Sequence, residues 1–177
     1  MSVITLRLAS LADADEISDL LDHAYGQLLR GAYEDAVIDA ALPYLTEADY
    51  DLLGSDTFRV AESGGQIVGC GGWTPWAPGT AEETPGLAHV RQLATHPSFL
   101  RRGIAARLLR ECLAEAAEEG YERAQVLASL VSVPLYERAG FTAVERDAIA
   151  LSAEVELPVV RMVAAISWQA DAARPAA

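Results

Sequence analysis

The chain has 177 residues, a length that suits one domain whose core is stable without disulfides or metal ions. Its formal net charge of -13 at pH 7 argues against nucleic acid as a partner, because the phosphates would be repelled by the average field of this surface. Cys70 and Cys112 lie in apolar surroundings without C-x-x-C spacing, so we expect reduced packing residues, with a disulfide between them as the less favoured alternative.

The N-terminal part of the chain predicts one strand followed by helices. Residues 3–8 read as a strand, and the next segment carries apolar residues at helical spacing as far as Leu28. A second helical pattern is predicted to stop at Pro43, because proline cannot continue a helix, and Thr46 with Asp49 opens a short helical piece. No basic region followed by an apolar stretch occurs at this end, and no apolar run in the chain is long enough to span a membrane. We therefore expect a cytoplasmic protein with no membrane partner.

Three strands are predicted in the middle of the chain. Residues 57–62 and 66–73 suit a hairpin with a Ser-Gly-Gly connection, and a loop rich in proline and glycine follows. Residues 87–95 form the third strand, whose two-residue period predicts two opposite faces. One face would carry His89, Arg91, Leu93 and Thr95, and the other would carry Val90, Gln92 and Ala94.

The remaining pattern is a long helix followed by shorter elements. The helix is predicted to begin near Ile104 and to end at Gly120. A strand, a short helix and two late strands follow at residues 123–127, 134–139, 141–145 and 155–168. We treat residues 1–169 as one mixed α/β domain and expect residues 170–177 to be a disordered tail.

The turn before the long helix is rich in arginine. Between Thr84 and Arg110 there is no Asp or Glu, whereas arginine occurs at positions 91, 101, 102, 107 and 110. This basic stretch favours an anionic ligand, although the same arginines could simply solvate a helix face. Gly103 begins the helix, where unpaired N–H groups and a missing Cβ let a phosphate approach the backbone. Because the turn is neither a P-loop nor a G-x-G-x-x-G turn, a different phosphate-bearing cofactor is implied.

These residues resemble the GNAT superfamily of acetyl-CoA-dependent N-acetyltransferases. The family pattern [QR]-x-x-G-x-[GA] is matched by LRRGIA at residues 100–105, except that Leu100 stands in the first position. A second match is LYERAGF at residues 135–141, and the likeness extends over residues 3 to 147. The resemblance implies a single domain with a central, mostly antiparallel mixed sheet, in which two parallel strands diverge near Thr95, flanked by helices.

The same resemblance implies where acetyl-CoA would bind as cosubstrate. The strand before the turn would contact the pantetheine arm through Leu93, Ala94 and Thr95. The turn would hold the pyrophosphate through its junction residues, which are Arg101, Arg102, Gly103, Ile104, Ala105 and Ala106. No spacing among the three histidines predicts a zinc site, and we expect no metal.

Two residues are candidates for the chemistry of acetyl transfer. The resemblance places Tyr136 beside the sulfur, where a phenol that stays protonated at neutral pH could donate to a leaving thiolate; without the resemblance, a core tyrosine is the better interpretation. His89 is the candidate proton acceptor for the amine, since an ordinary histidine is mostly neutral at pH 7, and a purely structural strand histidine is the alternative. Glu82 and Glu83 are further candidate bases.

The acceptor is predicted only as a primary amine on a small molecule or peptide, attacked directly in a ternary complex. The acidic surface favours a cationic amine. Four aromatic residues are candidates for the acceptor pocket or for the core, namely Tyr25, Tyr33, Trp73 and Trp76. The alternative function is a catalytically inactive acyl-CoA-binding sensor or subunit, and a nucleic-acid-binding domain is a weaker alternative. The oligomeric state is left open, with a homodimer as one possibility.

Overall fold

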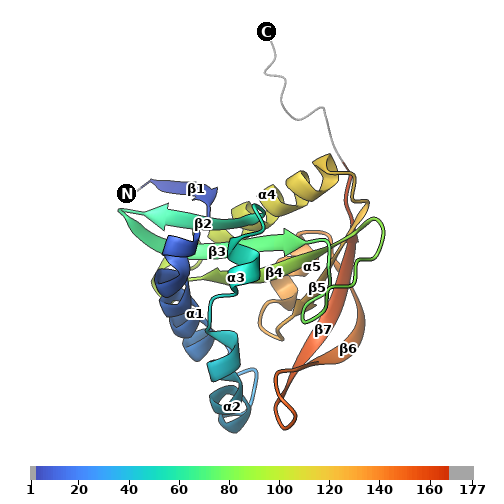
Figure 1. Ribbon diagram of the computed structural model, residues 1–177. Helices are drawn as coiled ribbons and strands as arrows, with labels where there is room; N and C mark the ends of the chain where they lie inside the picture. Colours follow the sequence, from blue (N-terminus) through green and yellow to red (C-terminus); the bar gives the residue numbers. More distant parts are fainter. Residues whose placement is uncertain (1–2, 168–177) are drawn as a thin grey trace.

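The computed structural model describes residues 3–167, so the predicted tail at residues 170–177 lies outside the described part. The described residues form seven strands and five α-helices (Figure 1). The strands are β1 (Ile4–Leu8), β2 (Phe58–Ser63), β3 (Gln66–Thr74), β4 (Leu87–Thr95), β5 (Arg123–Ala128), β6 (Thr142–Ala150) and β7 (Glu156–Ala165). The α-helices are α1 (Ala14–Leu28), α2 (Asp35–Leu45), α3 (Tyr50–Leu53), α4 (Ile104–Glu118) and α5 (Val133–Arg138), with short 3-10 turns η1 (Leu11–Asp13) and η2 (Pro97–Phe99).

All seven strands form one sheet in the order β1-β2-β3-β4-β5-β7-β6. Every neighbouring pair is antiparallel except β4 with β5. The parallel ladder stops at the pair His89 and Gln125, although β4 continues to Thr95 and β5 to Ala128. The mixed sheet with two diverging parallel strands is therefore confirmed. The divergence begins six positions before Thr95, earlier along β4 than we expected.

Helices cover both faces of the sheet. On one face, α1 buries Ile17 and Leu21 against Phe58, Val60 and other residues of β2 and β3. On the opposite face, Ile104 and Leu108 of α4 pack against Ala61 and Val68 of the same two strands. The amphipathic spacing of both helices explains this arrangement, since each presents one apolar stripe to the sheet. No helix within residues 3–167 is long and apolar enough to cross a membrane.

Strand β4 does not keep the two-residue alternation that its sequence predicts. His89 and Arg91 pair with Thr74 and Gly72 of β3, and Thr95 pairs with Gly69, but the register shifts between Cys70 and Gly72. The extra residue on β4 is accommodated at Gln92, which has a φ of 42°. A bulge of this kind reverses the side-chain alternation beyond it.

The predicted sharing of one face by His89, Arg91, Leu93 and Thr95 is therefore wrong. Leu93 packs with Ile104 and Leu108 on the α4 face, whereas Ala94 packs with the core beneath α1. Val90, the neighbour of His89 and Arg91, is also on the α4 side, with Leu109. His89 and Arg91 hence face α1 and α3, while Leu93 and Thr95 face α4.

Two further expectations about the helices are corrected. Pro43 does not stop α2, which continues to Leu45, because a proline near the end of a helix removes one hydrogen bond from a turn that is about to terminate. Thr46 does not open the next helix but closes α2, its hydroxyl donating to the Leu42 carbonyl at 2.9 Å. Asp49 alone caps α3, accepting from the amides of Asp51 and Leu52.

Candidate active site

A cavity of about 210 Å³ lies where β4 and β5 diverge. Its walls come from α1, the end of α2, β4, β5, α5, β6 and β7, so it passes through the sheet from the α1 side to the α5 side. The lining on the α5 side includes Leu93, Ser132 and Tyr136, and the lining on the α1 side includes Tyr25 and Arg91. Beyond His89 the edge of β4 that faces β5 has no ladder partner, so its backbone can bind an extended ligand.

Tyr136 brings its phenol into this cavity. The residue is 4% exposed and its ring lies edge-on to Phe141, 5.4 Å between centroids. Its hydroxyl makes no hydrogen bond to any atom of residues 3–167, although Tyr136 lines the cavity. Burial, and to a lesser degree the nearby Cys112, raises the pKa of Tyr136 above its ordinary value of 10, so the phenol remains a hydrogen-bond donor over the neutral range.

Tyr25 is a second phenol in the same cavity. It projects from α1, and burial raises its pKa, with smaller contributions from Cys70 and Tyr136. The helical pattern of the sequence could not separate it from the core residues of α1, since it lies one position from buried Ala24. Ser129 and Ser132 also line the cavity and were missed, because serines after a strand are common in ordinary turns.

His89 lies beside the cavity rather than in its lining. It occupies the last pair of the β4–β5 ladder, opposite Gln125, and is 4% exposed. Its Nε2 atom is enclosed without a hydrogen-bond partner among the described residues. Burial lowers the pKa of His89, and the positive charge of Arg91 lowers it further, so the imidazole is neutral at pH 7. Glu82 and Glu83 are exposed in the loop before β4 and do not line the cavity either.

The turn between η2 and α4 forms a concave set of backbone donors. Arg101 and Gly103 have φ values of 61° and 76°. No amide from Arg101 to Ala106 donates a hydrogen bond to an acceptor within residues 3–167, and a Cβ added to Gly103 would project into open space. Successive free N–H groups at the start of a 15-residue helix suit a phosphate group. The side chains of Arg101 and Arg102 are exposed, and Arg102 lies 4.7 Å over the Phe99 ring.

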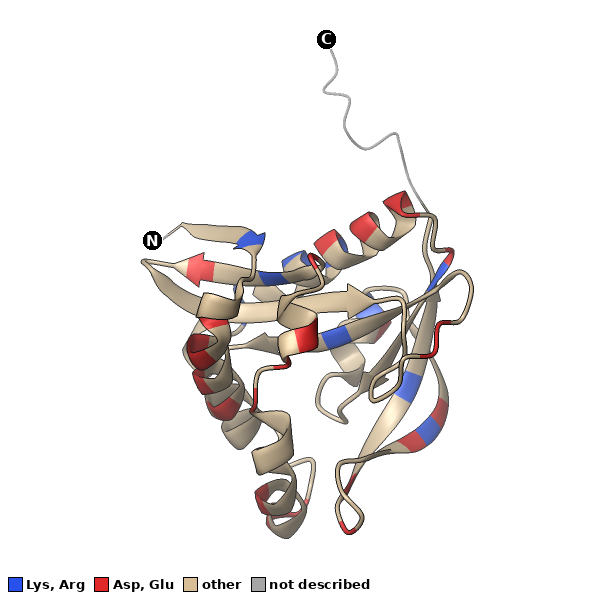
Figure 2. Ribbon diagram, in the orientation of Figure 1, with Lys and Arg blue, Asp and Glu red and all other residues tan. Residues whose placement is uncertain are grey.

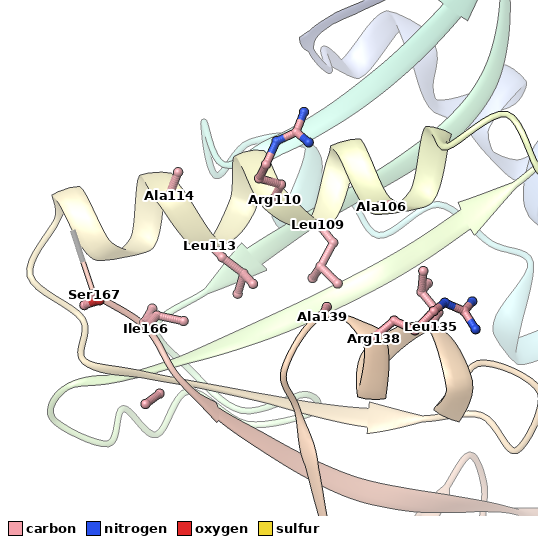
Figure 3. A pocket seen from close by; sticks show the side chains of 11 residues that line it. Ala106, Leu109, Arg110, Leu113, Ala114, Leu135, Arg138, Ala139, Ile166 and Ser167 are labelled. Carbon is pink, nitrogen blue, oxygen red and sulfur yellow. The ribbon is translucent and has the colours of Figure 1, made fainter. Parts of the chain in front are cut away.

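A larger groove of about 650 Å³ leads away from this turn, between α4 and α5. Leu109 and Leu113 point from α4 toward α5 and β7, and Leu135 and Arg138 come from α5 (Figure 3). Arg110 lies at the outer side of α4, on the rim of the groove (Figure 3). The groove is lined at one end by Ala106, whose amide is the last of the free ones, so it lies next to this turn.

The two cavities are lined by positive and no negative side chains, whereas the whole chain is strongly acidic. Acidic residues are spread along α1 and α4 (Figure 2), and the chain holds 26 of them. Neither cavity is lined by any aspartate or glutamate; their only charged lining residues are Arg91 in one and Arg110 and Arg138 in the other. The site therefore favours an anionic ligand within an anionic protein.

These features fit coenzyme A. Its phosphates match the free amides from Arg101 to Ala106 and the arginines of the groove. The pantetheine arm carries amides, which match the free edge of β4 and the enclosed, unpartnered hydroxyl of Thr95. Among residues 3–167, no cluster of three or more His, Cys, Asp or Glu side chains is arranged to hold a metal ion.

The remaining aromatic candidates have structural partners. Tyr33 donates to the Pro158 carbonyl at 2.7 Å and accepts from the Leu130 amide at 2.8 Å. Trp73 is buried, and its indole N–H donates to Glu115 at 3.1 Å. Trp76 is half-buried in the loop before β4, where its backbone forms an isolated antiparallel β-bridge with Glu83. None of the three lines the cavity at Tyr136, and only Tyr25 of the four does.

Comparison with known proteins agrees with this geometry. The Acetyltransferase (GNAT) family matches residues 17–141, and no curated protein matches the chain in sequence. Among solved structures, PaiA N-acetyltransferase of Thermoplasma acidophilum in complex with coenzyme A has a TM-score of 0.70 at 15% identity, with 92% of this chain and 99% of that chain covered. A GCN5-related N-acetyltransferase from Rhodopseudomonas palustris has a TM-score of 0.75 at 19% identity, covering 94% and 98%.

N-acetylglutamate synthase of Neisseria gonorrhoeae, complexed with coenzyme A and N-acetylglutamate, has a TM-score of 0.62 at 16% identity, covering 94% of this chain and 36% of that chain. At these identities the structural likeness establishes the fold. The family match spans most of the chain, from α1 to the end of α5, and includes both the turn before α4 and Tyr136. The chain belongs to the GNAT family of acetyltransferases.

Proposed function

We propose that this protein transfers the acetyl group of acetyl-CoA to a primary amine, with both substrates bound at once. The observation that carries the proposal is the cavity at the open edge of β4, into which Tyr136 brings an unpartnered phenol. The turn with the free amides at Gly103 begins the helix that follows this strand. Leu93 and Thr95 face the same side of the sheet as the helix that begins with this turn. The cavity then continues through the sheet, so an amine can approach from the α1 side.

The residues assigned to acetyl-CoA are those of the turn, the groove and the strand edge. The amides from Arg101 to Ala106 would hold the pyrophosphate, with Arg138 and Arg110 beside the remaining phosphate charge. Leu93, Ala94 and Thr95 would line the pantetheine arm, Ala94 through its backbone alone because its side chain packs beneath α1. When bound, acetyl-CoA supplies a thioester carbonyl carbon to which the amine nitrogen bonds, while the C–S bond breaks and its electron pair leaves on sulfur.

Tyr136 has the task of stabilising the charge that develops on sulfur. A buried phenol with a raised pKa keeps its proton until a thiolate appears, and then donates a strong charge-assisted hydrogen bond. Of the two protons that an ammonium acceptor loses, one ends on the thiol and the other in solvent. His89 remains our candidate for removing the second proton through water, because its imidazole is neutral at pH 7 and lies on β4 beside the cavity.

Thiol release from acetyl-CoA, measured with a panel of amines, tests the proposal. Turnover with any amine above the rate of hydrolysis supports the enzyme. Tight CoA binding by calorimetry without turnover across the panel would instead support the inactive acyl-CoA-binding subunit. Failure of acetyl-CoA to bind or to raise Tm would overturn both, because a ligand bound only by the folded state must stabilise it.

A further inference from the structure

The acceptor side of the cavity is mostly apolar and carries one cation. Seven of its lining residues are apolar or aromatic, namely Tyr25, Leu29, Leu45, Pro78, Ile149, Leu157 and Val159. Arg91 is the one charged residue in the whole lining. An ammonium group placed here would leave water without gaining a carboxylate partner from the lining, and it would meet a like charge. Among the cationic amines that the acidic surface favours, the lining therefore argues against a polycation.

Arg91 is held in place but incompletely neutralised. Its side chain is 12% exposed. One guanidinium nitrogen donates to the Thr74 hydroxyl at 3.2 Å, and another meets a single Asp49 oxygen at 3.4 Å, which is long for a charge-assisted hydrogen bond. The other Asp49 oxygen accepts from the amides at the start of α3. Burial lowers the pKa of Arg91 despite Asp49, so the cation gains from a second anion.

We propose that the acceptor is a small amine with an apolar body and a carboxylate, such as an apolar amino acid, and that Arg91 binds this carboxylate. This inference rests on the proposed acetyl transfer. A guanidinium has five N–H donors, of which the protein uses two, so a carboxylate can pair with the remaining ones. The apolar lining would take the side chain. A volume of about 210 Å³ suits a ligand of this size better than an aminoglycoside.

The bulge at Gln92 explains how the two substrates meet. Arg91 faces the α1 side of the sheet, while Leu93 faces the α4 side where the pantetheine arm is assigned. A carboxylate on Arg91 therefore anchors the acceptor on one side of the gap, with its amine free to reach toward the other. Tyr136 lines the same gap from α5. Arg91 acts here as a substrate-binding residue that sets specificity.

Matched acceptors test the carboxylate directly. Leucine, leucinamide and isopentylamine share the same apolar body and primary amine, but only leucine carries a carboxylate; methionine and phenylalanine vary the body, and spermidine is the polycation. We expect kcat/KM for the best apolar amino acid to exceed that of its amide and decarboxylated amine by about ten- to a hundredfold, the range for a hydrogen bond to a charged group. Equal or higher kcat/KM for the amide, the simple amine or spermidine would overturn the proposal.

Three variants assign the effect to Arg91. Arg91→Gln should lower kcat/KM for leucine far more than kcat/KM for isopentylamine, and so abolish the preference for the carboxylate. Arg59→Gln is the matched control, because Arg59 is also partly buried with one carboxylate partner, Glu115, but lies outside the cavity. Asp49→Asn keeps a capping side chain for α3 while removing the competing charge, so it should tighten binding of the amino acid. If Arg91 only joins β4 to α3, Arg91→Gln lowers Tm and Asp49→Asn leaves the preference unchanged, which contradicts the proposal.

A binding measurement separates this inference from the proposed function. With CoA present, N-acetylleucine and N-isopentylacetamide are titrated by calorimetry against wild type and Arg91→Gln. Tighter binding of N-acetylleucine that is lost in Arg91→Gln supports the carboxylate site even if no amine is turned over, a result that would refute only acetyl transfer. Turnover of amines with no carboxylate preference in either assay would refute only the carboxylate site.

Discussion

Replacing Tyr136 by phenylalanine should slow acetyl transfer with almost no effect on stability. In the protein the hydroxyl has no hydrogen-bond partner within residues 3–167, so its removal breaks no contact, and the change in the free energy of unfolding should be within about 1 kcal/mol. The ring, with its 5.4 Å contact to Phe141, is retained. Loss of one donor to developing charge should lower kcat by roughly ten- to a thousandfold, equivalent to about 1.4 to 4 kcal/mol.

The assay pairs kcat with CoA affinity, for wild type, Tyr136→Phe and a control, Tyr121→Phe. Tyr121 lies outside the cavity, with its ring 5.0 Å from Trp73, so its hydroxyl should be dispensable. Because burial keeps the pKa of Tyr136 above 10, the ratio of wild-type to mutant kcat should be constant between about pH 6 and pH 9. An unchanged kcat in a folded Tyr136→Phe protein would refute the assignment, and a loss of CoA affinity equal to the loss in kcat would indicate a binding role instead.

Three further predictions follow from the turn, the groove and β4. Gly103→Val should abolish the rise in Tm on adding acetyl-CoA, whereas the control Gly120→Val should not. Both glycines have positive φ and open space at Cβ, so both variants should lose a similar stability of about 1–2 kcal/mol. Equal CoA binding by the two variants would show that the turn is not the phosphate site. Arg138→Gln should weaken CoA binding and reduce the dependence of this binding on salt, measured by calorimetry between about 50 and 200 mM NaCl. An unchanged Kd would place the cofactor outside the groove that Arg138 lines. Because His89 has a lowered pKa in the folded state, the unfolded state binds the proton more readily, and the free energy of unfolding should fall as pH drops below about 6.5. His89→Gln should flatten this pH dependence, measured by urea unfolding. The same pH dependence in both proteins would assign the effect to other groups.

The sequence predicted the elements whose signals are local and repeated. The strand at Leu87–Thr95 and the start of the long helix at Ile104 agree with the structure, because His-Pro ends the strand and Gly103 precedes the helix. The sheet order could not come from these patterns, since pairing between β5 and β7 joins segments separated by the whole of α5 and β6. The family resemblance implied only a mostly antiparallel mixed sheet with two diverging parallel strands, and it also directed attention to Tyr136.

The candidate site was predicted unevenly for physical reasons. The turn before α4 is contiguous in sequence, so its glycine and arginines can be seen together. The cavity, in contrast, is assembled from α1, the end of α2 and all of the late strands, and Tyr25 carries no local signal that distinguishes it from a core residue. Arg91 was counted with the basic stretch before α4, yet its side chain lies in the cavity while Arg107 donates to the Ile4 carbonyl at 2.9 Å. Charge along the sequence therefore did not indicate which arginines act together.

The bulge in β4 is the feature that joins these parts into one site. In a regular strand Arg91 and Leu93 would share a face, and the strand could line only one side of the sheet with this pair. One extra residue at Gln92 turns Leu93 and Thr95 to the α4 side while His89 and Arg91 stay on the α1 side. Because β5 has already diverged after the pair of His89 with Gln125, both sides open into the same cavity. In the reaction that we propose, a single strand would thus contact the thioester on one side and the amine on the other, with the phenol of Tyr136 lining the same cavity.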